Sequence, residues 1–185
     1  FLYNDDTFGT NNPSRADGFY DSTAGRTNGA LYTVVGPNGE NMSGGWTGTF
    51  TLDSAAAWVS IQIHYRLILK EGYEPDEYSE ALLTLDGALI GVGTGNSLHR
   101  IFGDNGGNSS SIDSGWRTDT FLLANVSAEI HDMTFGVFNN KSTSSHELTE
   151  AVLDAITVTA GIATCTTDFD GDGATCDVDC NDEDD

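Results

Sequence analysis

Aspartates near the end of the chain are spaced in a way that suits a divalent cation. The run DFDGDGATCDVD places carboxylates at Asp168, Asp170, Asp172, Asp177 and Asp179. Alternate residues of a curled loop can all point inward, and a hard cation such as Ca²⁺ takes about six to eight oxygen ligands at about 2.3–2.6 Å. Gly173 permits a sharp turn within this run. The spacing therefore predicts a calcium site.

The same run resembles the calcium loops of EF-hands, dockerins and thrombospondin type 3 repeats. Positions one, three, five, seven and twelve of such a loop correspond to Asp168, Asp170, Asp172, Ala174 and Asp179, with Ala174 offering a backbone carbonyl. Position twelve is Asp in place of the bidentate Glu of an EF-hand, and no helices are expected beside the loop, so the dockerin or thrombospondin version fits better. The continuation DCNDEDD, with Asp182, resembles the start of a second acidic repeat of bacterial secreted proteins.

Two other interpretations of this segment stay open beside calcium. It could be a solvated acidic tail, or it could bind Mg²⁺, which also prefers oxygen ligands. Zinc is disfavoured because the three cysteines, Cys165, Cys176 and Cys180, lack a neighbouring CxxC or His pair. We expect instead one local disulfide among them in an oxidising compartment, with the pairing undetermined because the count is odd.

A second acidic run, EGYEPDEYSE over residues 71–80, follows the clearest strand. It is either a charged loop at the rim of a sandwich or part of a second metal site. In the second case Glu74, Asp76 or Glu77 would act together with Asn139, Asn140 or Glu147, provided that the two loops meet at one end of the fold.

Asp154 lies inside an otherwise apolar strand near the end of the fold. A carboxylate on a buried face is costly unless it is paired or bound to metal. With Asp5 or Asp6 it resembles the structural calcium site of jelly-roll carbohydrate-binding modules, and the alternative is an Asp154 that faces outward.

Trp46 and Trp116 each follow a glycine and enter strands from loops. Such indoles can form flat platforms on which sugar rings stack, but a tryptophan in a sandwich also packs in the core, and the sequence leaves both roles open. Four sequons, at Asn41, Asn108, Asn125 and Asn140, are compatible with glycosylation and a secretory origin.

Catalytic patterns are absent from the sequence. The four histidines, His64, His99, His131 and His146, lie in separate segments with no GxSxG, HExxH or Cys/His pattern beside them. Carboxylates are too abundant here to indicate a glycosidase pair. We therefore expect a protein that is not an enzyme.

The charge balance limits the partners. The 29 Asp and Glu against 7 Lys and Arg give a formal net charge of -22. Nucleic acid and anionic membranes would be repelled, and no apolar run is long enough for a membrane-spanning helix, so we expect neither nucleic-acid binding nor membrane insertion. Cations are the expected partners.

The elements that must position these residues are β-strands. Between Trp58 and Leu69 apolar residues alternate with polar ones, which is the period of a strand with one buried face. Asp86-Gly87 predicts a tight hairpin between Leu82–Leu85 and Leu89–Val92. Further strands are expected at Gly48–Leu52, Thr118–Leu123, Met133–Phe138 and Val152–Thr159. About eight to ten strands without helices predict an antiparallel two-sheet sandwich, a jelly roll, over residues 1–160, followed by an Asp-rich calcium-binding tail over 161–185.

Residues 1–159 also resemble jelly-roll modules of secreted or surface proteins of aquatic microbes. The segments that carry this resemblance are NDDTF, NMSGGWTGTF, YEPDEYSEALLTLDG, SGWRTDTF, FGVFNNKSTSSHE and VLDAITV. It implies a sandwich fold and an extracellular or cell-surface location, but no particular ligand.

Two functions are favoured over a third class, an enzyme. The first is a calcium-binding structural or adhesive subunit of a surface assembly, in which calcium makes the tail rigid and bridges copies of the chain or neighbouring extracellular domains. The apolar start Phe1-Leu2-Tyr3 could then add as a strand to a neighbouring sheet edge. The alternative is a non-catalytic carbohydrate-binding module of a secreted protein, with polysaccharide as its partner.

Overall fold

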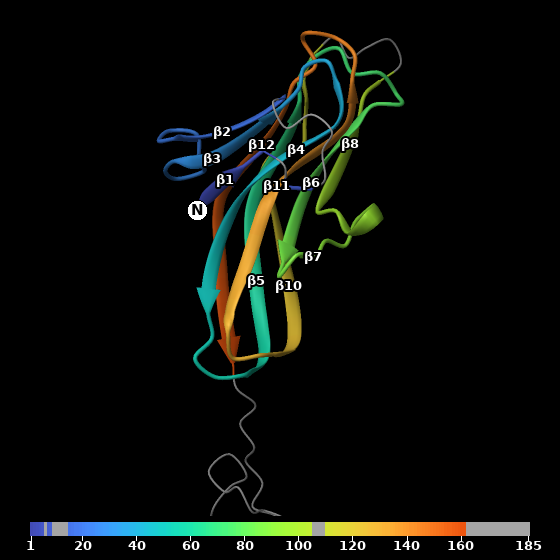
Figure 1. Cartoon of the computed structure of the whole chain (residues 1–185). Coiled ribbons are helices and arrows are strands. Elements are labelled where there is room, and N and C mark those ends of the chain that lie inside the picture. The colour runs from blue at the N-terminus through green and yellow to red at the C-terminus, as the bar shows by residue number, and fades with distance from the viewer. Residues whose placement is uncertain (6, 9–14, 105–109, 162–185) are drawn as a thin grey trace, which may run out of the picture.

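The structure is a computed structural model, and it describes residues 1–5, 7–8, 15–104 and 110–161. These residues form an all-β sandwich of two antiparallel sheets (Figure 1). Its strands are β1 (Leu2–Asn4), β2 (Ala16–Asp21), β3 (Ala30–Val35), β4 (Gly39–Thr51), β5 (Ala56–Leu69), β6 (Tyr78–Leu85), β7 (Ala88–Leu89), β8 (His99–Phe102), β9 (Ile112–Asp113), β10 (Arg117–Val126), β11 (Ile130–Ser142) and β12 (Thr149–Gly161). A 3₁₀ turn, η2 (Thr94–Asn96), follows β7.

The two sheets are built from strands that alternate along the chain. Sheet A has the order β1-β4-β11-β6-β7, with β8 also paired to β6, and sheet B has the order β10-β5-β12-β3-β2, with β9 also paired to β5. From β3 to β6 the chain changes sheet at each step, and it does so again from β10 to β12. This connectivity confirms the predicted antiparallel jelly-roll sandwich.

Strand β5 explains why the core forms where it does. Its inward side chains have no exposed surface, and they are Val59, Ile61, Ile63, Tyr65, Leu67 and Leu69. From the opposite sheet Phe135 packs on Tyr65 with ring centroids 5.9 Å apart. Burying one such aliphatic side chain contributes about 1.5–3 kcal/mol relative to leaving it exposed. The alternation predicted for Trp58–Leu69 is therefore confirmed, with the strand beginning two residues earlier.

Three of the other predicted strands lie within the longer strands β10, β11 and β12, and the predicted strand Gly48–Leu52 overlaps β4 but extends one residue beyond its end at Thr51. The predicted hairpin is also present, and its turn residues Asp86 and Gly87 have φ angles of 49° and 79°. Its second strand, β7, covers only Ala88–Leu89 and does not reach Val92. The twelve strands among the described residues exceed the eight to ten expected, and β1, β2, β3, β8 and β9 were not among the predicted ranges.

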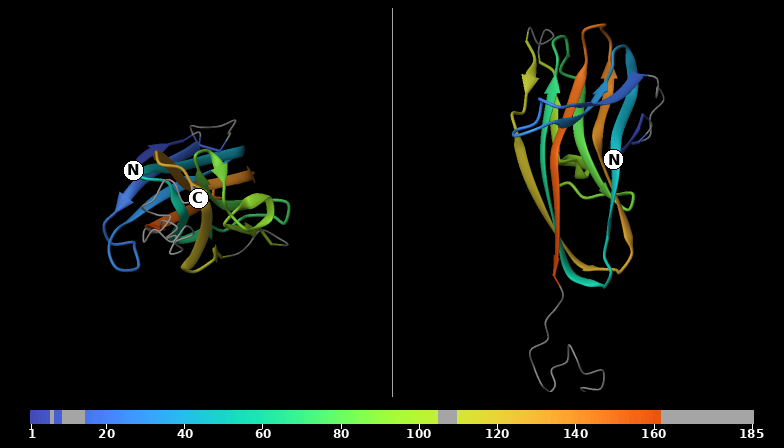
Figure 2. Two further views of the ribbon diagram at one scale, coloured as in Figure 1. Left: turned by 90° about the horizontal axis from the view of Figure 1, so that it is seen from below. Right: turned by 90° about the vertical axis from the view of Figure 1, so that its left-hand side faces the viewer.

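The long strands place different loops at the two ends of the sandwich. The β5–β6 and β11–β12 loops lie together at the upper end in Figure 1, and the β4–β5 and β10–β11 connections lie at the lower end, as Figure 2 also shows. Strand β12 runs from the upper end to the lower end and ends at Gly161. The predicted calcium loop, with Asp168, Asp170, Asp172, Ala174, Asp177, Asp179 and Asp182, and the three cysteines, Cys165, Cys176 and Cys180, lie outside the described residues.

No helix among the residues that the structure describes has the length and apolar character needed to cross a membrane.

Candidate functional site

A groove of about 650 Å³ lies on the outer face of sheet A. Its floor comes from alternate residues of three neighbouring strands, which are Thr47 of β4, Glu80, Leu82 and Thr84 of β6, and Thr134 and Phe138 of β11. Residues that point away from the core are normally exposed, yet Leu82 has 5% and Thr84 8% of its surface exposed. Other segments must therefore shield this face.

Two segments form the walls of the groove. On one side Thr7 and Phe8, which follow β1, line it, and the amide of Phe8 donates a hydrogen bond of 3.1 Å to Ser43 Oγ on β4. On the other side lie Leu89 of β7 and Gly95 of η2. The volume falls within the range of about 300–1,000 Å³ of small-molecule sites.

Aromatic rings extend the groove along the same face. Tyr78 of β6 lies between Phe102 of β8 and Phe138 of β11, with centroid distances of 5.5 and 6.3 Å. The guanidinium of Arg100 lies 4.4 Å from the centroid of Tyr78 and donates to Glu80 Oε1 from Nε at 2.8 Å. The outer face of sheet A therefore joins flat apolar surface to carboxylate and hydroxyl groups.

The hydroxyl groups of the floor are close to one another. Thr47 Oγ1 and Thr134 Oγ1 are 2.8 Å apart on the paired strands β4 and β11. The carboxylates of Glu80 and Asp132 also line the groove. Such groups donate to and accept from a ligand rich in hydroxyls.

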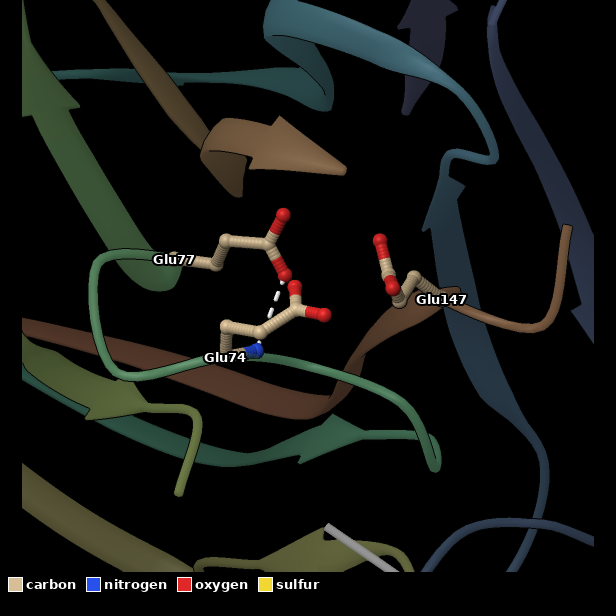
Figure 3. Close-up of side chains that lie close together, drawn as sticks. All are labelled: Glu74, Glu77 and Glu147. Atoms are coloured by element: carbon tan, nitrogen blue, oxygen red, sulfur yellow. Dashed lines mark hydrogen bonds between the residues drawn. The ribbon is translucent and has the colours of Figure 1, made fainter. Parts of the chain in front are cut away.

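A second polar site lies at the upper end of the sandwich, where three glutamates converge (Figure 3). Glu74 and Glu77 come from the β5–β6 loop and Glu147 from the β11–β12 loop, so the two loops do meet as the metal hypothesis required. One carboxylate oxygen from each residue lies within 4.8 Å of the others. Glu77 and Glu147 have no exposed surface.

The carboxylate of Glu77 is held by its own loop. Its Oε2 accepts a hydrogen bond of 3.0 Å from the amide of Glu74. Burial raises the pKa of Glu77 to about 7, and the nearby negative charge of Glu147 adds to the increase.

The other carboxylates predicted for a second metal site lie elsewhere. Asp76 is exposed and forms an ion pair with Lys141 at 2.9 Å, although it neighbours Glu77 in the sequence. Asp154 lies at an irregularity of β12, where the register with β5 shifts between Leu153 and Ala155. It is half-buried beside the β2–β3 connection at Gly25. Among the described residues neither Asp76 nor Asp154 belongs to a group of three acidic side chains that could hold a metal ion, whereas Glu77 does, and Asp6 lies outside the described residues.

The two tryptophans proposed as sugar platforms lie away from the groove. The indole N–H of Trp46 donates a 2.8 Å hydrogen bond to the carbonyl of Tyr32 in sheet B, and its ring contacts Tyr3, so Trp46 packs between the sheets. Trp116 is half-buried at the bend before β10.

The sequence carried one signal for the groove that was not used. The alternation along Met133–Phe138 places Phe138 on the face of the strand opposite Phe135, so an aromatic side chain could have been expected on the outer face of the sheet.

The sequons differ in what their asparagines do. Asn41 and Asn125 adopt positive φ angles, and Asn125 is exposed at the end of β10. Asn140 accepts a hydrogen bond from the amide of Tyr78 and donates one to the carbonyl of Asp76, so its amide ties β11 to the β5–β6 loop. Asn108 lies outside the described residues.

Searches for similar proteins found no matching protein-family profile and no matching curated protein. Among solved structures, the chain is similar to TmCBM61 in complex with β-1,4-galactotriose, with a TM-score of 0.38 and 12% identity over 86% of this chain and 87% of that one. It is similar to a family 35 carbohydrate-binding module from an environmental isolate, with a TM-score of 0.38 and 16% identity over 86% and 93%. A third similar structure is the alginate lyase AlgAT5 of polysaccharide lyase family 7, with a TM-score of 0.40 and 9% identity over 78% and 83%.

These similarities assign neither a ligand nor a reaction to this chain. The structures found include carbohydrate-binding modules and an enzyme. The expectation that this protein is not an enzyme therefore remains a prediction.

Proposed function

We propose that this chain is a non-catalytic carbohydrate-binding module that holds a neutral oligosaccharide or polysaccharide on the outer face of sheet A. The sequence had left this function open as the alternative to a calcium-binding structural or adhesive subunit. The observation that carries the proposal is the groove together with the aromatic rings that continue it. An extracellular or cell-surface location fits this function and is proposed with it.

Sugars present two kinds of surface, and the groove supplies a partner for each. The CH groups of a pyranose ring form an apolar patch that packs on an aromatic face such as Phe138 or Tyr78. The hydroxyl groups at the edge of the ring need donors and acceptors, which Thr47, Thr134 and Glu80 provide. The elongated arrangement of groove and rings across β11, β6 and β8 favours a chain of sugars over a single residue.

Affinity electrophoresis of the full chain in gels that contain neutral galactan, xylan or β-glucan tests this proposal. At least one polymer should retard the wild type, and Phe138→Ala should weaken that binding by about tenfold or more, because truncating a central aromatic contact typically costs more than about 1.4 kcal/mol.

The matched control is Trp58→Ala, since Trp58 is an aromatic residue with 41% exposure on β5 of sheet B, away from the groove. It should bind as the wild type does. If circular dichroism shows Phe138→Ala to be folded and its retardation is unchanged, the groove is not the binding surface.

The second candidate function is the calcium-dependent assembly subunit, favoured by the exposed edge of sheet A. Strand β1 is an edge strand, and Phe1 and Leu2 have 66% and 76% of their surface exposed. Strand β1 already pairs with β4, however. A strand from a second copy would therefore have to pair with the free edge of β1 or replace β1 beside β4. Light scattering would support assembly if the mass increased in millimolar calcium, and a monomer both there and in chelator would rule it out.

A further inference from the structure

We infer that Glu74, Glu77 and Glu147 form a binding site for one Ca²⁺ ion, which links the β5–β6 loop to the β11–β12 loop at the upper end of the sandwich. This site is separate from the groove of sheet A, and it shares no residue with the calcium loop predicted at Asp168–Asp179. The three side chains point toward one another in Figure 3.

The first argument is that each buried glutamate has one oxygen left without a partner. Glu77 uses Oε2 to accept from the amide of Glu74, and Glu147 uses Oε2 to accept from the amides of Thr143 and Ser144. The Oε1 atoms of both residues are fully buried and accept no hydrogen bond from the part of the chain that the structure describes. An unsatisfied buried acceptor is costly, and more so when it is charged. A cation at this point would supply the missing ligand to both oxygens.

The second argument is charge. Three carboxylates converge, and the Nζ of Lys141 lies 3.8 Å from Glu77 Oε1 but 2.9 Å from Asp76 Oδ2. The ammonium group of Lys141 therefore pairs mainly with the exposed Asp76, and an excess of negative charge remains at the three glutamates. A divalent ion offsets this excess more fully than the distant ammonium does.

The third argument is geometry and ligand type. Two oxygens on one Ca²⁺ lie at most about 4.6–5.2 Å apart, since each Ca–O distance is about 2.3–2.6 Å, and the 4.8 Å limit of this cluster fits that span. Mg²⁺ demands near-ideal octahedral geometry and keeps several of its waters, whereas Ca²⁺ accepts the flexible coordination that carboxylates from two separate loops provide. Oxygen ligands without histidine or cysteine favour a hard cation over zinc. Water would complete the coordination.

The surrounding backbone holds Glu147 in position. Gly72 has a φ of +112°, and a Cβ at that position would lie 3.0 Å from Glu147 Cγ. The amide of Lys70 also donates a 2.8 Å hydrogen bond to the carbonyl of Leu148, which ties the two loops together. The backbone of the β5–β6 loop therefore packs closely against the Glu147 side chain.

Calcium binding is best measured on a full chain whose aspartate loop is disabled by Asp168→Asn, Asp170→Asn and Asp172→Asn together. Isothermal titration calorimetry with Ca²⁺ should then detect one equivalent, and calcium should raise the melting temperature. Adding Glu77→Gln should weaken this binding at least about tenfold and abolish the thermal shift. The amide oxygen of Gln can still accept from the amide of Glu74, and without calcium the loss of repulsion should leave the melting temperature equal or higher.

Glu71→Gln in the same background is the matched control, because it makes the same change at an exposed position of the same loop. The Glu71→Gln variant should still bind one equivalent of Ca²⁺. Terbium gives an independent measurement, because excitation of the nearby Tyr73 should sensitise its luminescence and Glu77→Gln should remove the signal.

Two results would overturn the inference. One is that the background protein binds no calcium at millimolar concentration. The other is that a folded Glu77→Gln variant binds one equivalent as tightly as the Glu71→Gln control. Loss of glycan binding by Phe138→Ala bears only on the groove, so the two proposals can fail separately.

Discussion

His131 is a buried histidine whose charge is stabilised by two acceptors. Its Nδ1 lies 2.8 Å from Asp86 Oδ2 and its Nε2 lies 3.1 Å from the carbonyl of Ser127, so the protonated ring can donate to both. The hydrogen bond with Asp86 raises the pKa of His131 above its ordinary value. This contribution to stability is complete below about pH 6.5, the pKa in the unfolded chain, and is lost as the pH rises through the folded value.

Replacing Asp86 by Asn tests this pair without disturbing the hairpin, since Asn is well tolerated at the positive φ of this turn. NMR titration should show a lower pKa for His131 in the variant. Thermal unfolding should show that the wild type is more stable than Asp86→Asn at pH 5.5 by about 1 kcal/mol or less, because Asp86 is half-exposed, and that the difference shrinks at pH 8.5. A difference that is the same at both pH values would contradict the assignment of the charged ring.

The two faces of strand β5 should differ sharply in their tolerance of substitution. Ile63 has no exposed surface, so Ile63→Ala should lower the free energy of unfolding by about 2–5 kcal/mol through lost burial and a residual cavity. Gln62 is the neighbouring, exposed residue, and Gln62→Ala should change stability by about 0.5 kcal/mol or less. Denaturant titration of both variants measures these changes in the free energy of unfolding. Equal decreases for Ile63→Ala and Gln62→Ala would mean that the strand does not face the core as described.

Strand β5 also shows what the sequence can predict. Its strict alternation specifies both the strand and its buried face, because only one register places every aliphatic side chain inside. The edge strand β1 and the short β8 carry no such pattern, since few of their side chains are buried and their existence depends on pairing with β4 and β6. Local sequence therefore predicted the long strands of both sheets, including the edge strand β10, but it missed the edge strands β1 and β2 and the interior strand β3.

The candidate sites depend on contacts between distant segments, which limits prediction further. The sequence suggested Glu77 as a ligand and raised Glu147 as a partner, but only the sheet order brings the β5–β6 and β11–β12 loops together. Phe138 and Tyr78 become neighbours because β11 pairs with β6. The sequence left Trp46 open as either a sugar platform or a core residue, because the hydrogen bond that decides its position is made to Tyr32 in the opposite sheet.

At the scale of the whole molecule, the net charge of -22 should govern which polysaccharides bind. A polyanion such as polygalacturonate approaches a surface of the same sign, so its binding should be at least about tenfold weaker than that of the best neutral polymer at low ionic strength. Salt screens such repulsion, and the Debye length falls from about 30 Å at 0.01 M to about 10 Å at 0.1 M. Affinity electrophoresis in chelator at these two salt concentrations should therefore show that the polyanion binds less weakly, relative to the neutral polymer, as salt increases. Retardation by the neutral polymer should stay constant. Strong retardation by polygalacturonate at low salt, lost on adding salt, would instead reveal a local cationic surface, and Arg100 beside Tyr78 would be the first residue to substitute.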